Sequence, residues 1–431
     1  MAAATRDRLR GEIKSKHEFL KIHLDGIQVG DLIYNSYCRY YLEATLNLED
    51  DRLWNLVYES TVIHGICKRY FDSTRVLFLV SDHLSYLRSG IPARIALSRH
   101  IPVVRVGWGM QVERIGADID ADGYCHNPKH LPWRLFKSLF EELSESEKKE
   151  ARAIGRRILE ERWEGVIVED NLPEISTHRG VDRVRVFEDT GRPRVLIMAH
   201  DFFDEVNRYG QMIFPDFFEW VIELLEMAKD TEFDWYVKPH PQVKFQQERN
   251  ELNEKVVGEL RARFPEVRFL ESTVANRQIV EEGVDAVFTV RGSVAHEFAY
   301  LGIPVVCGGD NMHMSFDFNI HPRSLEELRE IVLRADRLEL KIDREEVEAF
   351  CYMNNFYFDE TWTRHVKDRP EVNYIQRDEY INIGGSTDVF RYLLDHSSEA
   401  NDDILKASFD AFFASRAFTH ASSSDFPKRV A

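Results

Sequence analysis

The chain has 431 residues, 44% of them hydrophobic and 30% charged, with 74 acidic against 56 basic side chains and a net charge of −18. These proportions are those of a globular protein, and the length exceeds that of one ordinary domain, so we expect two. The acidic balance argues against a nucleic-acid partner, because such binding depends on neutralising phosphates with lysine and arginine. It leaves room for a local basic pocket that binds a small anion.

The cysteines and the hydropathy of the chain indicate its compartment. The five cysteines are scattered and form no CxxC pair, which favours a reducing, cytoplasmic environment. The N-terminal segment lacks the apolar core that a signal peptide needs, and no apolar run is long enough to cross a bilayer. Its basic residues fit either a solvated first helix or peripheral contact with the inner face of an anionic membrane.

The first half of the chain predicts strands and helices in alternation. Asp25-Gly26, between two stretches of alternating hydropathy, predicts a tight hairpin because both residues tolerate positive φ. A helix is expected at about 50–70, and a second at 86–98 between a buried strand at 75–82 and another strand at 101–107. Strand, helix and strand in this order indicate a parallel α/β unit.

A charged helix and a polar stretch close the first half. Ser144 and Glu147 form a predicted capping box at the start of a helix that runs to about residue 163. The polar stretch 169–193 shows little periodicity and predicts a linker. The chain beyond it is therefore expected to form a separate domain.

Five short apolar strands alternate with helical patterns in the second half, at 194–200, 234–238, 266–271, 284–290 and 303–308. This alternation predicts a doubly wound parallel sheet, which binds ligands beyond the carboxyl ends of its strands. We therefore expect an α/β fold with an acceptor-side domain at 1–190 and a donor nucleotide-binding, Rossmann-like domain at 191–340. A helical segment at 341–395 is expected to pack back across the domains, followed by a partly disordered tail at 396–431.

The stretch TVRGSVAHEFAYLGIPVVCGGDN carries the strongest chemical signal. A strand ends at a turn, Arg291-Gly292-Ser293, that opens a helix whose amides and dipole suit a phosphate. Arg291 adds a fixed guanidinium group for the phosphate oxygens. His296 and Glu297 share a helical face with Ser293, where a carboxylate can accept hydrogen bonds from ribose hydroxyls. The alternative is that Ser293 only caps the helix and Glu297 is solvated.

A lysine and a histidine end the strand in WYVKPHPQ. Prolines on both sides of His240 fix the backbone and hold its imidazole in a stiff loop. We take this strand as the neighbour of the one that ends before Arg291, so that Lys238 and His240 meet the same anionic ligand. Asn311 is expected to complete the donor-binding residues. A histidine with a purely structural role is the alternative.

Carboxylates follow the first strand of the second half, in MAHDFFDEVNRYG. His200, Asp201 and Asp204 are expected on the ligand side of the sheet. Either aspartate can serve as nucleophile or base toward a sugar carbon. Asp201 can equally act only as the cap of a turn.

A second polar group follows the strand at 75–82. Asp82, as a further catalytic candidate, and His83, Tyr86 and Arg94, on the acceptor side, are expected to face the crevice from the opposite domain. There they can activate an acceptor hydroxyl. A turn followed by a solvated helix face is the alternative interpretation.

Metal and phosphate-loop motifs are missing from the sequence. Asp118, Asp120 and Asp122 have the spacing of a calcium loop, but Lys129 stands where the bidentate glutamate belongs, so we interpret this segment as a solvated turn. The sequence has no Walker loop, zinc spacing or GxGxxG. We therefore expect no metal in the site.

Two motifs resemble those of a known group of enzymes. KPHP after a strand, and S-x-x-x-E-x-x-x-x-G-x-P-V in SVAHEFAYLGIPV, are similar to motifs of bacterial capsule and surface-polysaccharide transferases. This group includes the Kdo transferases, and it shares the histidine-proline motif with bacterial sialyltransferases and the glycerophosphotransferases of teichoic-acid synthesis. HDFFDEVNRYGQMIFPDFFEW and GDLIYNSYCRYY also look like surface-carbohydrate biosynthesis proteins. The similarity is strongest over about 194–311.

The resemblance implies a GT-B architecture, in which two Rossmann-like domains face each other across a cleft. It implies that the donor nucleotide binds to the C-terminal domain. Lys238, His240 and Ser293 would then lie at the donor phosphate, and Glu297 at the ribose or base.

The resemblance also bears on the nucleophile. Members of the Kdo group that retain configuration use an aspartate, and Asp201 and Asp204 are both candidates for this role. Where the group has a serine or threonine pair before the helix, this sequence has Arg291-Gly292. The donor sugar and the stereochemical outcome stay open.

These features predict a metal-independent glycosyltransferase that moves a sugar from a nucleotide-activated donor, a CMP-linked acid such as Kdo, onto a surface glycan or glycolipid. The acceptor would be of capsule, O-antigen or lipopolysaccharide type. Lys238, His240, Arg291 and the helix amides would stabilise the leaving phosphate, so no cofactor is expected. The alternatives are a CDP-polyol phosphotransferase of teichoic-acid-like polymer synthesis, a sugar-nucleotide epimerase of the same fold, and a nucleotide- or glycan-binding protein without chemistry.

Overall fold

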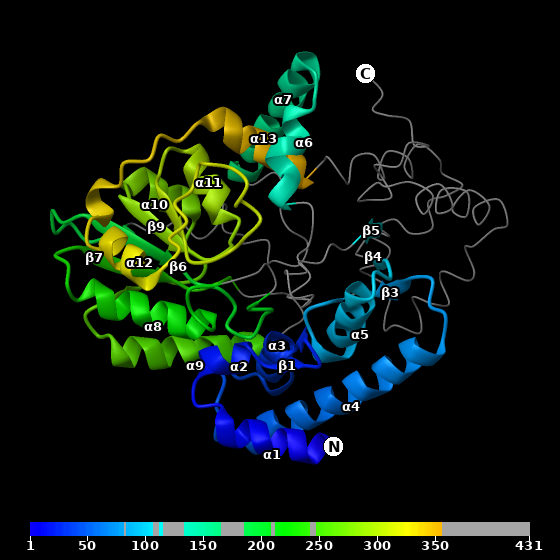
Figure 1. The fold of residues 1–431 in the computed structure, drawn as a ribbon. Coiled ribbons are helices and arrows are strands. Elements are labelled where there is room, and N and C mark those ends of the chain that lie inside the picture. Colours follow the sequence, from blue (N-terminus) through cyan, green and yellow to red (C-terminus); the bar gives the residue numbers. More distant parts are fainter. Residues whose placement is uncertain are drawn as a thin grey trace.

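The computed structural model describes residues 1–81, 83–106, 112–114, 133–164, 185–207, 212–241 and 247–355. These residues form a mixed α/β fold in which a parallel sheet and its helices occupy one side and a mostly helical N-terminal part the other (Figure 1). None of the helices in these ranges combines the length and apolarity needed to cross a membrane. Residues 356–395 of the predicted helical segment 341–395, the tail at 396–431 and most of the predicted linker lie outside the described residues.

The N-terminal part begins with helices and one hairpin: α1 (Ala2–Glu12), α2 (Lys16–Leu20), β1 (His23–Leu24), β2 (Ile27–Gln28), α3 (Gly30–Tyr41) and α4 (Asp51–Ser73). The predicted hairpin is confirmed, since β1 pairs antiparallel with β2 through Asp25 and Gly26, at φ values of 46° and 83°. The predicted helix at 50–70 is confirmed as α4, which Asp50 caps. Phe19 and Trp54 lie in the core that these helices share.

A small mixed sheet follows, formed by β3 (Leu79–Ser81), β4 (Val103–Val106) and β5 (Val112–Arg114), with α5 (Leu87–Ser98) between its first two strands. β3 and β4 are parallel as predicted, whereas β5 is antiparallel to β4. The prediction of a buried strand over 75–82 is wrong: β3 has three residues, and Val80 is 53% exposed because β3 lies at the sheet edge. Within the described residues, this part therefore has no doubly wound sheet of its own.

The second half has one parallel sheet formed by the five predicted strands: β6 (Arg194–Met198), β7 (Asp234–Lys238), β8 (Arg268–Phe269), β9 (Ala286–Thr289) and β10 (Val305–Cys307). Their order in space is β10-β9-β6-β7-β8. Counted along the chain, this is the order 3-2-1-4-5 of dinucleotide-binding folds read from β8. The order reverses between β6 and β9, and the helices cover both faces of the sheet.

The alternation of side chains along the strands determines which helices cover which face. Val195 and Ile197 pack with α8 (Phe217–Ala228), α9 (Gln247–Arg263) and α12 (Leu325–Val332). Leu196 and Met198 pack with α10 (Asn276–Glu282) and α11 (Val294–Tyr300) on the other face. Figure 1 shows these two helical layers on opposite sides of the sheet.

Helices from both halves of the chain pack together beside α11. They are α6 (Phe136–Glu141), α7 (Glu145–Trp163) and α13 (Arg344–Asn355), with short 3-10 turns at Trp133–Leu135 and Ala335–Arg337. The predicted capping box is confirmed at the start of α7. The α7 and α13 helices approach so closely that a Cβ at Gly155 would lie 2.0 Å from the Glu348 carbonyl oxygen. Thus α6 and α7, which precede the predicted boundary at residue 190, pack on the second half of the chain.

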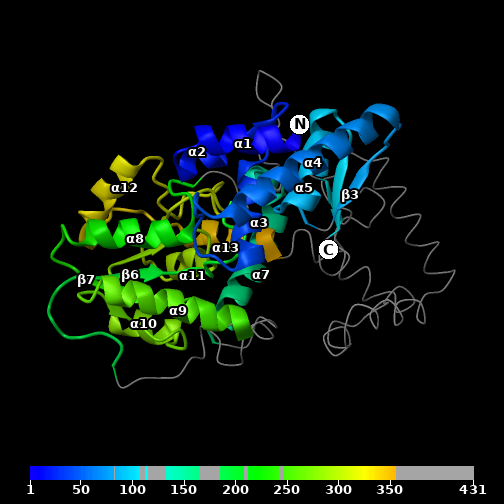
Figure 2. The same ribbon diagram turned by 90° about the horizontal axis from the view of Figure 1, so that it is seen from below.

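Buried polar contacts join the N-terminal part to α8. The Tyr34 hydroxyl of α3 donates to the Asp216 carboxylate, and the Thr45 hydroxyl donates to it at 2.5 Å. The other oxygen of Asp216 accepts from the Glu219 amide and so caps α8. An ion pair between Lys16 and Glu219 lies alongside, and Figure 2 shows α2 and α3 next to α8. One carboxylate therefore fixes the start of α8 and the position of α3.

The contact between α7 and α13 is tested by Gly155→Ala. We expect this change to lower the free energy of unfolding by about 1–3 kcal/mol, because backbone atoms of α13 leave no room for a methyl group. The matched control is Gly258→Ala in α9, where nothing lies within 4 Å and a gain of about 0.5–1 kcal/mol is expected. Urea unfolding followed by circular dichroism measures both variants. An equal response of the two variants would contradict the close packing.

Candidate functional site

The carboxyl ends of β6 and β9 lie side by side at the point where the strand order reverses. In sheets of this kind ligands bind in the crevice at that point. The loop from β6 to α8 and the turn after β9 both begin there. One prediction needs correction: β7, which carries WYVK, is not the neighbour of β9, because β6 lies between them. Lys238 and His240 therefore end a strand one position further along the same edge.

His200 holds the turn after β9 in place. Its Nε2 accepts hydrogen bonds from the backbone amides of Val290 at 3.1 Å and Arg291 at 3.3 Å. The ring also stacks on Phe217, with centroids 4.5 Å apart. Burial, together with the nearby charges of Arg291 and His240, holds the pKa of His200 well below its usual range. A neutral ring that accepts at Nε2 is what these amide donors require.

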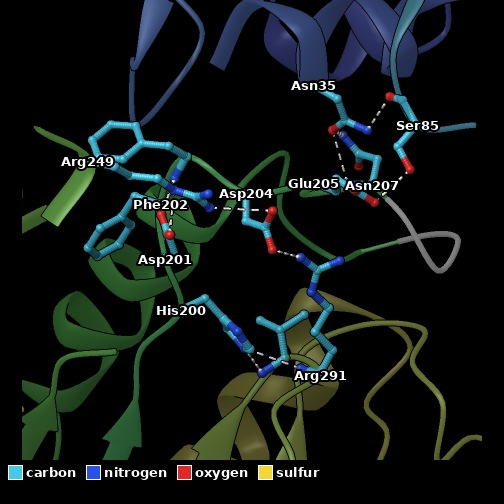
Figure 3. Close-up of polar contacts among 12 residues, drawn as sticks. Asn35, Ser85, His200, Asp201, Phe202, Asp204, Glu205, Asn207, Arg249 and Arg291 are labelled. Atoms are coloured by element: carbon cyan, nitrogen blue, oxygen red, sulfur yellow. Dashed lines mark hydrogen bonds and ion pairs between the residues drawn. The ribbon is translucent and has the colours of Figure 1, made fainter. Parts of the chain in front are cut away.

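Four side chains of alternating charge lie in a row above the strand ends, in the order Asp201, Arg249, Asp204 and Arg291 (Figure 3). Arg249 Nε lies 2.5 Å from Asp201, and Arg249 Nη2 lies 3.4 Å from Asp204 Oδ1. Arg291 Nη2 lies 3.3 Å from Asp204 Oδ2. Both arginine side chains are only 10% exposed, whereas that of Asp204 is 44% exposed. The two guanidinium groups thus share one solvent-accessible carboxylate.

Asp201 is held more completely than Asp204. One of its oxygens accepts from the Phe203 amide at 3.1 Å and from the Asn253 side chain at 3.0 Å, while the other pairs with Arg249. Burial raises the pKa of Asp201, and the positive charge of nearby His240 opposes this rise. Its hydrogen bond to Phe203 closes a turn, which is the capping role considered as an alternative. Of the two predicted nucleophile candidates, Asp204 is the one that solvent reaches.

The turn Arg291-Gly292-Ser293 has the features of an anion-binding turn. The amides of Gly292 and Ser293 donate to no acceptor among the described residues. The Ser293 hydroxyl makes no capping hydrogen bond to α11, so helix capping does not account for it. The Arg291 guanidinium lies 5.1 Å above the Phe217 ring, which restricts its orientation. The turn therefore presents two amides, a hydroxyl and an oriented positive charge.

Lys238 is a buried cation at the carboxyl end of β7. It is 1% exposed, and its ammonium group has no hydrogen-bond partner among the described residues. Burial lowers the pKa of Lys238 to about 8, against the opposing effect of the Glu297 carboxylate. Glu297 in turn pairs with Arg162 of α7, at 3.0 Å. The predicted donor-site carboxylate is thus already engaged with α7, and it also acts electrostatically on the lysine charge.

His240 lies in the loop after β7, where its Nδ1 is 2.7 Å from the Pro241 carbonyl oxygen. A proton on this ring is near enough to lower the pKa of both His200 and Asp201. His240 is therefore close to the row of charged side chains at the end of β6, although its own strand is β7. The structure brings together His240, Asp201, Asp204 and Arg291 as expected from the sequence.

Two other predicted donor-site residues take part in internal contacts. The Asn311 side chain donates to the carbonyl oxygens of Val290 and Gly309 and accepts from the His313 amide. His296 Nδ1 lies 3.0 Å from His313 Nε2 in an aromatic environment. Both residues hold the segment after β10 against α11 and the end of β9.

The N-terminal part meets the β6–α8 loop through a second polar cluster (Figure 3). His83 Nε2 lies 2.6 Å from one oxygen of Glu205, and the Ser85 hydroxyl donates to the other at 2.8 Å. Asn35 of α3 accepts from the Asn207 amide at 3.2 Å. Tyr86 lies against His83, with ring centroids 4.9 Å apart. Two acceptor-side candidates therefore reach the same loop as the aspartates.

The remaining first-half candidates lie elsewhere. Both terminal nitrogens of Arg94 pair with Asp31 inside the N-terminal core, at 2.6 and 2.5 Å, so this side chain does not face the crevice. Asp82 lies outside the described residues. The sequence analysis did not select Arg249, Glu205 or Arg162. Nothing in their local sequence marks them, since each acquires its role from a partner between 45 and 135 positions away.

Within the described ranges, no group of three or more histidine, cysteine or acidic side chains is arranged to hold a metal ion. No protein-family model matches the sequence, and no curated protein is similar to it. Among solved structures, Thermosulfurimonas dismutans KpsC, a beta Kdo 2,4 transferase, aligns over 63% of this chain and 77% of its own, with 17% identity and a TM-score of 0.36. That similarity is too low to assign a fold or an activity.

Lys238→Met tests the buried cation. We expect the free energy of unfolding at pH 7 to rise by roughly 2 kcal/mol, because the variant removes a desolvated charge and keeps the shape of the side chain. The control Lys229→Met makes the same substitution at an exposed lysine and should change the free energy of unfolding by no more than about 0.5 kcal/mol. Chemical denaturation of both variants and the wild type gives the comparison. A less stable Lys238→Met variant would contradict the assignment.

The difference in stability between Lys238→Met and the wild type should also depend on pH, with a sign that the pKa of Lys238 fixes. Because the pKa of Lys238 is about 8 in the folded protein and about 10.4 in the unfolded chain, the unfolded state binds more protons between these values. The cost of the buried charge is full below pH 8 and is relieved as the pH rises toward 10. The stability gap between Lys238→Met and the wild type should therefore narrow from pH 8 to pH 10. A constant gap would show that this lysine does not titrate in that range.

Proposed function

We propose that the protein is a glycosyltransferase that uses a nucleotide-activated sugar and binds its donor phosphate where β6 and β9 separate. The supporting observation is that Arg291 and two backbone amides lie after β9 at the strand-order reversal, with His240 near the end of β6 and the buried charge of Lys238 at the end of β7. A leaving nucleotide phosphate gains negative charge as the glycosidic bond breaks. Fixed donors and cations aimed at that point lower the barrier most.

Each group has a distinct part in the proposed reaction. Arg291 and the amides of Gly292 and Ser293 would bind phosphate oxygens, and His240 would donate to the leaving oxygen. Lys238 would add to the positive potential of the site without contacting solvent. These groups suffice in number and charge to stabilise a leaving phosphate, so a divalent ion is not part of the proposal.

The proposed acceptor enters from the side of the N-terminal part. Glu205 lies one residue from Asp204 and pairs with His83, so a carboxylate–histidine pair is available to take a proton from an acceptor hydroxyl. We propose a surface glycan or glycolipid as acceptor and an acidic sugar linked to CMP as donor. Both follow from the motif resemblance. Peripheral contact with the inner membrane face is proposed for a glycolipid acceptor.

A panel of CMP, CDP, UDP, GDP and TDP in thermal-shift measurements tests the donor. Binding to the folded state raises the melting temperature, and we expect CMP to raise it most. A larger effect of CDP would favour the polyol phosphotransferase instead. If no nucleotide stabilises the protein, the proposed function is wrong.

His240→Ala tests the leaving-group role. We expect donor turnover to fall by about 100-fold or more, the usual loss on removing a general acid, while the circular dichroism spectrum stays unchanged. The control His17→Ala changes a histidine on the exposed side of α2 and should retain wild-type turnover. Both enzymes are assayed with and without EDTA, which should leave the rates unaltered. Wild-type turnover by His240→Ala would refute the assignment.

A further inference from the structure

Asp204 has an unusual position for a carboxylate in a site that is proposed to bind an anion. Its two oxygens lie 3.4 Å from Arg249 and 3.3 Å from Arg291, so it bridges two guanidinium groups. Phosphate and carboxylate ligands make the same bridging contact with arginine pairs. The carboxylate of Asp204 thus has the chemistry and the geometry of a bound oxyanion.

The two guanidinium groups are held independently of Asp204. Arg249 is fixed by its 2.5 Å contact with Asp201, which Asn253 and the Phe203 amide also hold. Arg291 is restricted by the Phe217 ring below it. Removing the Asp204 carboxylate therefore leaves both cations in place, with the gap between them open to solvent.

The contacts of Asp204 are also the weaker ones. Its side chain is 44% exposed and its ion-pair distances exceed 3 Å, whereas Asp201 is 8% exposed and 2.5 Å from Arg249. Exposed ion pairs contribute little free energy, because water screens them and the side chains lose entropy. A ligand oxyanion can replace Asp204 at small cost, but it cannot replace Asp201.

We propose that Arg249 and Arg291 form an oxyanion subsite of the substrate and that Asp204 occupies it until the substrate binds. This inference rests on the proposed function and adds Arg249 to the substrate-binding residues. The ligand group is either the donor phosphate or the carboxylate of an acidic sugar, which share the same arginine chemistry. Displaced from both guanidinium groups, Asp204 becomes a solvated carboxylate beside the bound substrate.

Asp204→Asn distinguishes a displaceable carboxylate from a structural one. Binding of inorganic phosphate and of acetate is measured by thermal shift at low ionic strength for the wild type and the variant. We expect one of these anions to bind roughly tenfold more tightly to Asp204→Asn, because the competing carboxylate is gone. If phosphate is the anion that binds more tightly, the ligand of the subsite is the donor phosphate. If acetate binds more tightly, the ligand is the carboxylate of an acidic sugar. A purely structural role predicts the opposite, since the arginines would lose their alignment and both anions would bind more weakly.

Asp230→Asn is the matched control, because it removes one exposed carboxylate that pairs with Arg329, away from the site. The affinity of Asp230→Asn for both anions should equal that of the wild type. If this variant gained affinity as Asp204→Asn does, the change in net charge alone would explain the effect and the inference would be wrong. The role of Arg249 is tested by adding Asp201→Asn and Arg249→Gln together to Asp204→Asn, which removes both charges of the buried Asp201–Arg249 pair and leaves neither of them unpaired. Loss of the tenfold gain is expected, and its persistence would exclude Arg249 from the subsite.

The nucleotide panel separates failure of this inference from failure of the proposed function. If CMP stabilises the wild type but neither anion gains affinity in Asp204→Asn, the inference is wrong and the function stands. If an anion gains affinity but no nucleotide binds, the subsite stands and the glycosyltransferase proposal is wrong.

Discussion

The ion pair between Asp201 and Arg249 is the interaction on which the rest of the site depends. Both side chains are nearly excluded from solvent, so either one alone would carry the cost of an unpaired buried charge. Together they fix the loop after β6 against α9. That loop then presents Asp204 to the arginines of the second half and Glu205 to His83 and Ser85 of the N-terminal part.

His200, one residue before Asp201 in the same loop, also joins separate parts of the site. It follows β6 but accepts hydrogen bonds from the amides that follow β9, so it ties the two strand ends together. Phe217 supports both this ring and the Arg291 guanidinium. A neutral histidine and an aromatic ring thus align the groups proposed to meet the substrate. The next two amides after β9 remain available for it.

Several buried charged side chains in this region lower the stability of the fold. The ammonium group of Lys238 has no hydrogen-bond partner in the described part of the chain, and its lowered pKa reflects the cost of its burial. Arg249 and Arg291 are likewise held with most of their surface away from water. Charged groups kept in such positions are typical of sites that stabilise charge on a ligand. These groups gather near the carboxyl ends of β6, β7 and β9, while both faces of the same sheet pack into apolar cores.

The sequence by itself predicted the five strands of the second half, because each is a short apolar run between polar segments. It also selected Arg291, Asp204 and His240 as candidates, since these follow strands whose carboxyl ends share one edge. Only the tertiary structure decided the strand order, which placed β6 rather than β7 beside β9. Only it could pair Asp201 with Arg249, Glu297 with Arg162 and Arg94 with Asp31. The physical reason is that a charged side chain looks the same in sequence whether water or a distant partner neutralises it. The choice between the two is made only when the chain packs.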